Sequence, residues 1–209
     1  MAVITITRQY GAGGSLVARL VAERLGWTVI DNEFVGEVAK RAGLPPEEVA
    51  AREERAPSLM QRLASTLAIS SPEMFVPGEP TESDEETLIR ITERVIAEAA
   101  AHGRVVLVGR GAPAYLGTAP EESRAVHAYV VAPRETRIRT VMARLEVAHG
   151  EAAKTVDEID ASRERYLERY YRRRRDDAAN YHVVVNTSLL GYEGAAEVVV
   201  DVAQRRGLV

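Results

Sequence analysis

Glycines, an arginine and a serine gather at residues 8–15, a stretch that reads RQYGAGGS. Glycines let consecutive backbone N–H groups point into one concave turn, and such a turn binds anions. A helical pattern follows, so the positive end of a helix would add to the attraction for phosphate. The hydroxyl of Ser15 is placed to coordinate Mg²⁺. The stretch therefore predicts a nucleotide-phosphate site formed by Arg8, Gly11, Ala12, Gly13, Gly14 and Ser15.

This stretch departs from the common phosphate-binding loop, which reads G-x-x-x-x-G-K-[ST] between a strand and a helix. Gly13 and Ser15 match the pattern, whereas Arg8 stands at the first glycine and Gly14 stands at the lysine. The lysine normally neutralises the phosphates during transfer, so another cation must replace it. Arg8 and the arginines of the C-terminal half are the candidates. An ordinary glycine-rich turn is the alternative, and the position after the first predicted strand favours the phosphate site.

Two further charged residues follow predicted strands. Arg110 lies between Gly109 and Gly111, which allow a close backbone approach. A guanidinium matches phosphate oxygens in pairs, so we favour a contact to phosphate over a surface arginine. Asp31 has two interpretations of equal weight: a cap for the helix that follows, or a contact to a substrate hydroxyl or a magnesium-bound water.

Arginines are concentrated at residues 163–175, near the end of a predicted helix. Most of them are expected to form a solvated face together with nearby glutamates. Arg163, close to Asp160 in the sequence, is the member that we expect to contact phosphates. Residues 151–180 contain as many acidic as basic residues, which disfavours a nucleic-acid patch.

The composition excludes several classes of function. The chain has 209 residues and no cysteine, which excludes disulfides, thiolate metal sites and cysteine nucleophiles. Its net charge of −4 argues against a dedicated nucleic-acid binder. The histidines show no metal-ligand spacing and no serine sits in a G-x-S-x-G turn. No signal peptide or bilayer-spanning run is visible. We expect a cytoplasmic protein with nucleotide substrates and without membrane or nucleic-acid partners; a homo-oligomer is compatible with the sequence.

Five short apolar segments must position these residues, and helical patterns separate them. The segments are 3–7, 27–30, 105–108, 125–132 and 181–186. This alternation predicts an α/β fold with a five-stranded parallel sheet and helices on both faces. Each chemical segment follows a predicted strand, namely 8–15, 31, 109–111 and 186–188. Since ligands bind beyond the carboxyl ends of such strands, we expect one shared site.

Four stretches together resemble the cytidylate kinase-like family; in order they read ITITRQYGAGGS, VVLVGRGAPAYL, APRETRIRTVMARLE and NYHVVVNTSLLG. The resemblance implies a three-layer P-loop kinase fold in a single domain. The core would comprise residues 1–31, 103–150 and 180–209, with a helical substrate-side insert at about 32–102 and an arginine-bearing lid at about 151–179. The loop without a lysine is then a trait of the family.

The resemblance also implies roles for individual residues. Gly109-Arg110 matches part of the motif D-G-R-D, in which the arginine holds the acceptor's phosphate. Asp160 and Arg163 match the lid motif D-S-x-R, whose acid contacts the nucleotide sugar and whose arginine bridges phosphates. Arg137 matches an arginine at the start of the lid helices.

One more match and several departures concern the two nucleotides. Thr187 lies in the triplet Asn186-Thr187-Ser188, which resembles the D-T-[ST] that ends the last strand beside the donor base. Val108 and Gly111 stand where D-G-R-D has its two acids, and Val156 stands where cytidylate kinase carries a further lid arginine. Phosphate handling is therefore implied, whereas selectivity for cytidine is not.

The expected activity is ATP-dependent phosphoryl transfer to a nucleoside monophosphate, with Mg²⁺ as cofactor. Arg110, Arg137 and Arg163 would stabilise the charge that spreads during transfer. Two alternatives stay open. One is a nucleotide-binding sensor with little turnover, which the missing lysine favours, and the other is a kinase of a non-nucleotide small molecule.

Overall fold

The computed structural model of the chain describes residues 2–31, 82–109, 111–117 and 125–209. Its strands are β1 (Val3–Arg8), β2 (Thr28–Asp31), β3 (Val105–Val108), β4 (Ala125–Val131) and β5 (Val183–Asn186). Its helices are α1 (Gly14–Leu25), α5 (Glu82–His102), α6 (Ala112–Leu116), α7 (Arg134–Leu145), α8 (His149–Tyr171) and α9 (Thr187–Arg205), with a 3₁₀ turn at Ala178–Asn180. The segment 32–81, which carries most of the predicted insert, lies outside the described residues.

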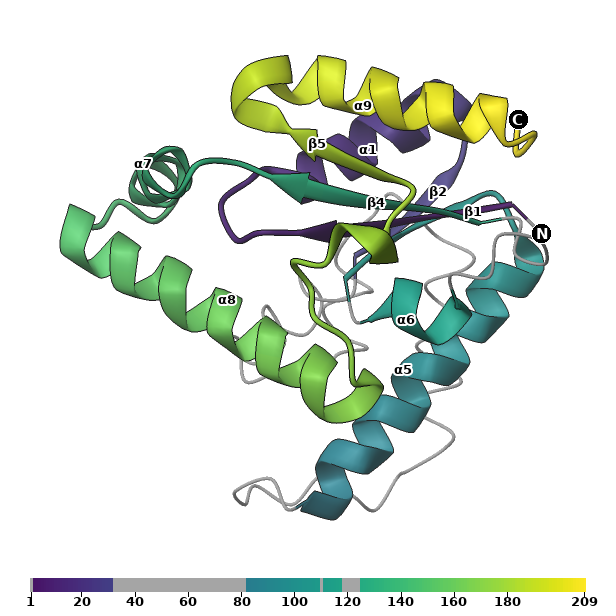
Figure 1. Ribbon diagram of the computed structural model, residues 1–209, viewed down its shortest axis with the longest axis horizontal. Helices are drawn as coiled ribbons and strands as arrows, with labels where there is room; N and C mark the ends of the chain where they lie inside the picture. Colours follow the sequence, from purple (N-terminus) through teal and green to yellow (C-terminus); the bar gives the residue numbers. More distant parts are fainter. Residues whose placement is uncertain (1, 32–81, 110, 118–124) are drawn as a thin grey trace.

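The strands of the described chain form one parallel sheet in the order β2-β3-β1-β4-β5. β1 lies in the middle, with Val3 opposite Val105 of β3 and Ala125 of β4. Helices α1 and α9 cover one face of the sheet, while α5, α6 and α8 lie on the other (Figure 1). The predicted α/β fold with a five-stranded parallel sheet is therefore confirmed.

Alternation along β1 divides the buried core between the two faces of the sheet, because successive side chains of a strand point in opposite directions. Ile4 and Ile6 pack with α1 and α9, whereas Val3 packs with α5. The two strands next to β1 are buried almost throughout: β3 reads VVLV and β4 reads AVHAYVV. This double burial explains why these strands show continuous apolar runs in the sequence.

A smaller apolar cluster joins α7 and α8 to the phosphate loop, far from the centre of the sheet. Its buried members are Tyr10, Ile138, Val141, Ala152 and Val156. Tyr10 is the member that comes from the loop after β1, so the packing of the two helices also fixes that loop. Figure 1 shows α7 beyond the end of the sheet at which β4 leads into it, and α8 running from there back along one face of the sheet.

Helix boundaries differ from the prediction at two places. The final helix, predicted at about 192–206, spans Thr187–Arg205 in the structure and has a kink at Gly191, whose φ is 67°. Glycine adopts this left-handed conformation without strain, so the chain makes one turn, bends and continues. The helix predicted at 151–175 is α8, which ends at Tyr171 because Arg172 takes a left-handed conformation. The division into core, insert and lid stays a prediction.

Candidate active site

The glycine-rich loop joins β1 to α1 at the carboxyl edge of the sheet. Gly11 and Gly13 have φ angles of 80° and 79°, which favour glycine over any L-residue. Space is also short there, since a Cβ at Gly11 would lie 2.7 Å from the carbonyl oxygen of Arg137. A Cβ at Gly13 would collide with the ring of Tyr192. The loop therefore needs its glycines both for backbone conformation and for close packing.

The first residues of α1 meet the end of β2 at the same edge. The hydroxyl of Ser15 donates a 2.6 Å hydrogen bond to Oδ2 of Asp31. The other carboxylate oxygen, Oδ1, lies 3.5 Å from Nη2 of Arg8 and is buried without a hydrogen-bond partner among the described residues. A hydroxyl beside a carboxylate with an unsatisfied oxygen supplies the hard oxygen ligands that Mg²⁺ prefers.

Magnesium commonly binds to one or two protein oxygens and completes its coordination with water and substrate phosphates. Ser15 and Asp31 fit that mode because they lie where the phosphates of a nucleotide would meet the start of α1. Among the described residues, no cluster of three or more His, Cys, Asp or Glu could hold a metal ion by itself. The arrangement therefore suits a metal that arrives with its nucleotide.

Asp160 of α8 lies at the centre of a buried ionic network. Its Oδ2 accepts a 2.6 Å hydrogen bond from Nη1 of Arg137, and its Oδ1 accepts one of 2.7 Å from Nη1 of Arg175. Oδ1 also accepts the backbone N–H of Tyr10 at 3.0 Å. Burial is the largest single influence on the pKa of Arg175 and lowers it, but Asp160, Tyr129 and Glu164 together outweigh burial and raise the pKa overall. One carboxylate thus joins α7, α8 and the phosphate loop.

Arg137 is held in place by more than its ion pair. Its Nε donates to the carbonyl oxygen of Ala132 at 3.0 Å, and Nη1 donates to the carbonyl oxygen of Tyr10 at 3.2 Å. The side chain is buried. The structure therefore brings Arg137 and Asp160, which the sequence assigns separate roles, into one contact. Their predicted roles toward phosphate and sugar stay predictions.

Tyr10 lies between two guanidinium groups. Arg144 stands 4.8 Å and Arg163 5.4 Å from the centre of the ring, and Arg144 also donates to the phenol oxygen. Nη1 of Arg163 donates to the carbonyl oxygen of Arg8 at 3.1 Å. Cations over aromatic faces are attracted by the ring quadrupole. The predicted lid residue Arg163 is therefore next to the phosphate loop, and its role in transfer stays a prediction.

The chain matches the model of the cytidylate kinase-like family over residues 3–189, far more than half of its length. The chain belongs to this family. Membership supports phosphoryl transfer in general and leaves the acceptor open. A search of curated protein sequences finds no match.

Solved structures show the fold that this cytidylate kinase-like protein shares with others. An uncharacterized protein from Eubacterium ventriosum ATCC 27560 aligns with a TM-score of 0.61 at 19% identity, covering 98% of this chain and 99% of the other. A shikimate kinase from Bacteroides thetaiotaomicron gives 0.49 at 14% identity, covering 100% and 99%. A shikimate kinase from Acinetobacter baumannii, in complex with shikimate, gives 0.45 at 17% identity, covering 98% and 90%. These two kinase likenesses are too distant to inform the choice of substrate.

Thr187, the family residue expected beside the donor base, contacts the phosphate loop directly. Its hydroxyl donates to the carbonyl oxygen of Ala12 at 2.9 Å and lies 3.4 Å from that of Val131. Asn186, just before it, caps α9 by accepting the N–H of Ser188 at 3.0 Å. The triplet therefore holds the loop against the last helix, and contact with the donor base stays a prediction.

Arg110, the family residue expected at the acceptor's phosphate, lies outside the described residues. Gly109 and Gly111 on either side of it have positive φ angles of 81° and 69°. A Cβ at Gly111 would lie 2.5 Å from Cε2 of Tyr171 of α8. The start of α6 is thus pressed closely against the predicted lid helix.

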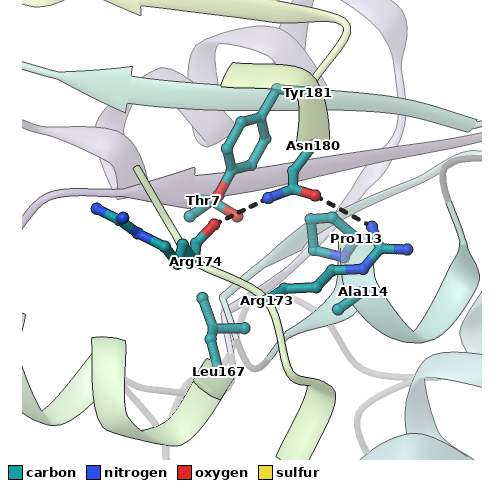
Figure 2. Close-up of a pocket in the computed structure, with 8 residues that line it drawn as sticks. All are labelled: Thr7, Pro113, Ala114, Leu167, Arg173, Arg174, Asn180 and Tyr181. Atoms are coloured by element: carbon teal, nitrogen blue, oxygen red, sulfur yellow. Dashed lines mark hydrogen bonds between the residues drawn. The ribbon is translucent and has the colours of Figure 1, made fainter. Parts of the chain in front are cut away.

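A small hollow lies next to α6, on the face of the sheet that α8 covers. Figure 2 shows its lining, which is Thr7, Pro113, Ala114, Leu167, Arg173, Arg174, Asn180 and Tyr181. Nη1 of Arg173 donates to Oδ1 of Asn180 at 3.3 Å, and Nδ2 of Asn180 donates to the carbonyl oxygen of Arg174 at 2.8 Å. Two of its lining residues, Pro113 and Ala114, belong to α6, which begins directly after Gly111.

Sequence reasoning missed three residues of this site: Tyr10, Arg144 and Arg175. Each contacts a predicted residue or the loop through packing between distant segments. The one local signal was the aromatic residue inside a glycine-rich turn, where small residues are usual.

In the described part of the chain, no helix combines the length and apolar character that crossing a membrane would need.

Proposed function

We propose that this protein transfers the γ-phosphoryl group of ATP to a nucleoside monophosphate. The observation that carries the proposal is the contact of Ser15 with Asp31 at the start of α1, directly after the glycine turn. N–H groups of the turn would cradle the donor's phosphates, and the positive end of α1 would add to their attraction. Mg²⁺, bound by Ser15 and Asp31, would neutralise charge on the phosphates.

In the reaction, an oxygen of the acceptor's phosphate forms a bond to the γ-phosphorus. The bond from that phosphorus to the bridging oxygen breaks, and ADP leaves with the electron pair. Such a transfer needs positioning and charge stabilisation more than a dedicated base. Arg163 is suitably close to the loop, and Arg110 is expected at the acceptor's phosphate from the family resemblance alone.

Asp160 and Arg137 support this function by fixing the loop and the predicted lid in one arrangement. Asp160 accepts hydrogen bonds from Arg137, from Arg175 and from the backbone N–H of Tyr10, so its carboxylate is already engaged within the protein. We therefore propose that the pair positions the loop, in addition to any contact with nucleotide.

The test measures ADP formation from ATP with a panel of nucleoside monophosphates, together with nucleotide affinity by calorimetry. Stimulation by at least one monophosphate supports the proposal, and the best acceptor defines its specificity. Tight ATP binding without stimulation by any acceptor would instead support the sensor, which the glycine at position 14 favours. Stimulation only by a non-nucleotide alcohol would support a small-molecule kinase, in line with the departures at Val108 and Gly111.

A further inference from the structure

Gly14 stands where the common phosphate loop has its lysine, and the side chain of Arg8 packs against it. Gly14 opens α1 and is not among the residues with a positive φ, so its backbone admits any L-residue. A Cβ built on it would lie 2.5 Å from Cβ, 2.8 Å from Cγ and 3.2 Å from Cδ of Arg8. The stem of Arg8 therefore fills the space in which a side chain at position 14 would begin.

The head of the Arg8 side chain reaches the reacting edge of the site. A Cβ at Gly109 would collide with Nη1 of Arg8, so the guanidinium extends to the end of β3. Nη2 lies 3.5 Å from Oδ1 of Asp31, the carboxylate that Ser15 contacts. Arg8 is buried. Its charge thus stands between the predicted magnesium ligands and the segment that leads to Arg110.

The other arginines near the loop are engaged differently. Arg137 and Arg175 share the carboxylate of Asp160, to which they donate at 2.6 Å and 2.7 Å. Arg163 lies over the ring of Tyr10. The Arg8–Asp31 ion pair is looser, because Oδ1 of Asp31 has no hydrogen-bond partner among the described residues. Arg8 therefore faces a carboxylate oxygen that lacks a hydrogen-bond donor in the described part of the chain, beside the hydroxyl of Ser15.

We infer that Arg8 supplies the positive charge that a P-loop lysine supplies from position 14, so that positions 8 and 14 have exchanged glycine and cation. The inference deepens the proposed phosphoryl transfer and rests on it. A guanidinium can contact two phosphate oxygens at once, whereas an ammonium acts as a point charge. Arg8 would neutralise the β- and γ-phosphate oxygens as ADP leaves.

Reciprocal substitution tests this exchange on the full-length protein. Arg8→Gly should lower kcat for ADP formation about a hundredfold, the loss typical of one donor to a developing charge. Gly14→Lys alone should also impair the protein, because the new side chain meets the stem of Arg8. The double variant completes the motif G-x-x-x-x-G-K-[ST] and should recover at least about tenfold of the lost activity. Thermal unfolding of each variant shows that it is folded.

Two further variants separate charge from packing. Arg8→Gln keeps most of the stem and should lose as much kcat as Arg8→Gly if the charge matters. Arg19→Gln removes an exposed charge from α1, the helix that Gly14 opens, and should leave kcat unchanged. A folded Arg8→Gln with undiminished kcat, or a folded double variant no better than Arg8→Gly, would overturn the inference.

Nucleotide affinity keeps this test independent of turnover. If the unaltered protein forms no ADP with any acceptor, the proposed function fails. The inference then still requires that Arg8→Gly weakens ATP binding at least about tenfold, and that the double variant restores it. Equal ATP affinities for the unaltered protein and Arg8→Gly would contradict the inference that Arg8 replaces the P-loop lysine, whatever the activity.

Discussion

The carboxylate of Asp160 accepts a 3.0 Å hydrogen bond from the backbone N–H of Tyr10, a residue 150 positions earlier in the chain. The predicted lid helix α8 is thus tied to the phosphate loop through main-chain atoms. The same carboxylate holds Arg137 and Arg175, so a change at Asp160 affects three elements together. A nearby aspartate on α8 offers a matched comparison.

Asp160→Ala should lower the free energy of unfolding by about 3 kcal/mol, because two buried arginines, Arg137 and Arg175, lose the carboxylate that they share. Asp157 lies almost one turn earlier and makes a 2.6 Å ion pair with Arg134, but both side chains are exposed. Asp157→Ala should therefore leave stability nearly unchanged. Urea unfolding of both variants measures the difference. Similar stabilities for the two variants would contradict the importance of the buried network.

Ser15→Ala and Asp31→Asn should each raise the Mg²⁺ concentration needed for half-maximal ADP formation. We expect this concentration to increase about tenfold, which is the lower end of the effect that losing one group beside a bound metal has on metal affinity. The physical reason is the loss of one oxygen from the pair at the start of α1. A magnesium titration at saturating ATP measures this shift. An unchanged titration for both variants would place the metal elsewhere.

Gly13→Ala should destabilise the protein by about 1–2 kcal/mol through its left-handed backbone, with a further loss from collision with Tyr192. It should also weaken ATP binding, because the loop must shift. Gly194→Ala on α9 is the control, since a Cβ there makes an ordinary 3.5 Å contact. That change should stabilise the helix by about 0.5 kcal/mol. Thermal unfolding and calorimetry distinguish the two.

Stability should fall as the pH drops, because of the buried His127. Burial lowers the pKa of His127 from 6.5 to about 4; the hydrogen bond to Gly117 acts in the opposite direction, and the charge of His182 lowers it again. In the unfolded chain the imidazole of His127 binds a proton near pH 6.5, whereas in the folded protein it binds one only near pH 4. The contribution of His127 to the free energy of unfolding is therefore fully present above pH 6.5, and about 3 kcal/mol of it is lost as the pH falls to 4.

Unfolding in urea between pH 4 and pH 7.5 measures this dependence. His127→Gln should flatten the part of the slope that His127 causes, and a remaining slope is expected because burial also lowers the pKa of His182. His149→Gln removes an exposed imidazole and should keep the original slope. If His127→Gln had the same slope as the unaltered protein, the burial of His127 would not govern the acid response.

Arg163→Ala should lower kcat about a hundredfold, which corresponds to an activation free energy higher by roughly 3 kcal/mol, if the guanidinium stabilises the spreading phosphate charge. Arg165 is the comparison, because it lies on the same helix and is exposed. Arg165→Ala should leave kcat unchanged. Steady-state ADP formation at saturating substrates measures both. Equal kcat values for the two variants would remove Arg163 from the transfer step and leave it a packing role against Tyr10.

The sequence was informative where local pattern and fold agree. The β-branched run at Val3–Arg8 and the glycine turn after it predict both the central strand and the phosphate loop. Ser15 and Asp31 could be expected at one edge because each follows a strand. Their hydrogen bond could not, since it depends on β2 and β1 being separated by β3 in the sheet.

Contacts made by α7 and α8 were beyond the reach of periodicity. Helical spacing indicates which residues face inward, but not which distant carbonyl or N–H they meet. For this reason Arg137 and Asp160 carried separate expectations from the family resemblance, and the structure shows them in a shared ion pair. Arg175 looked like one of several solvated arginines, whereas it is buried.

The phosphate loop is anchored at two points, by Asp160 at Tyr10 and by Thr187 at Ala12. Folding has therefore already restricted the motion of the backbone that would receive a nucleotide. An incoming ligand loses less of its contact energy to ordering this segment, so its affinity depends mainly on the contacts themselves. Loosening either anchor should weaken nucleotide capture even when every phosphate-binding group is still present.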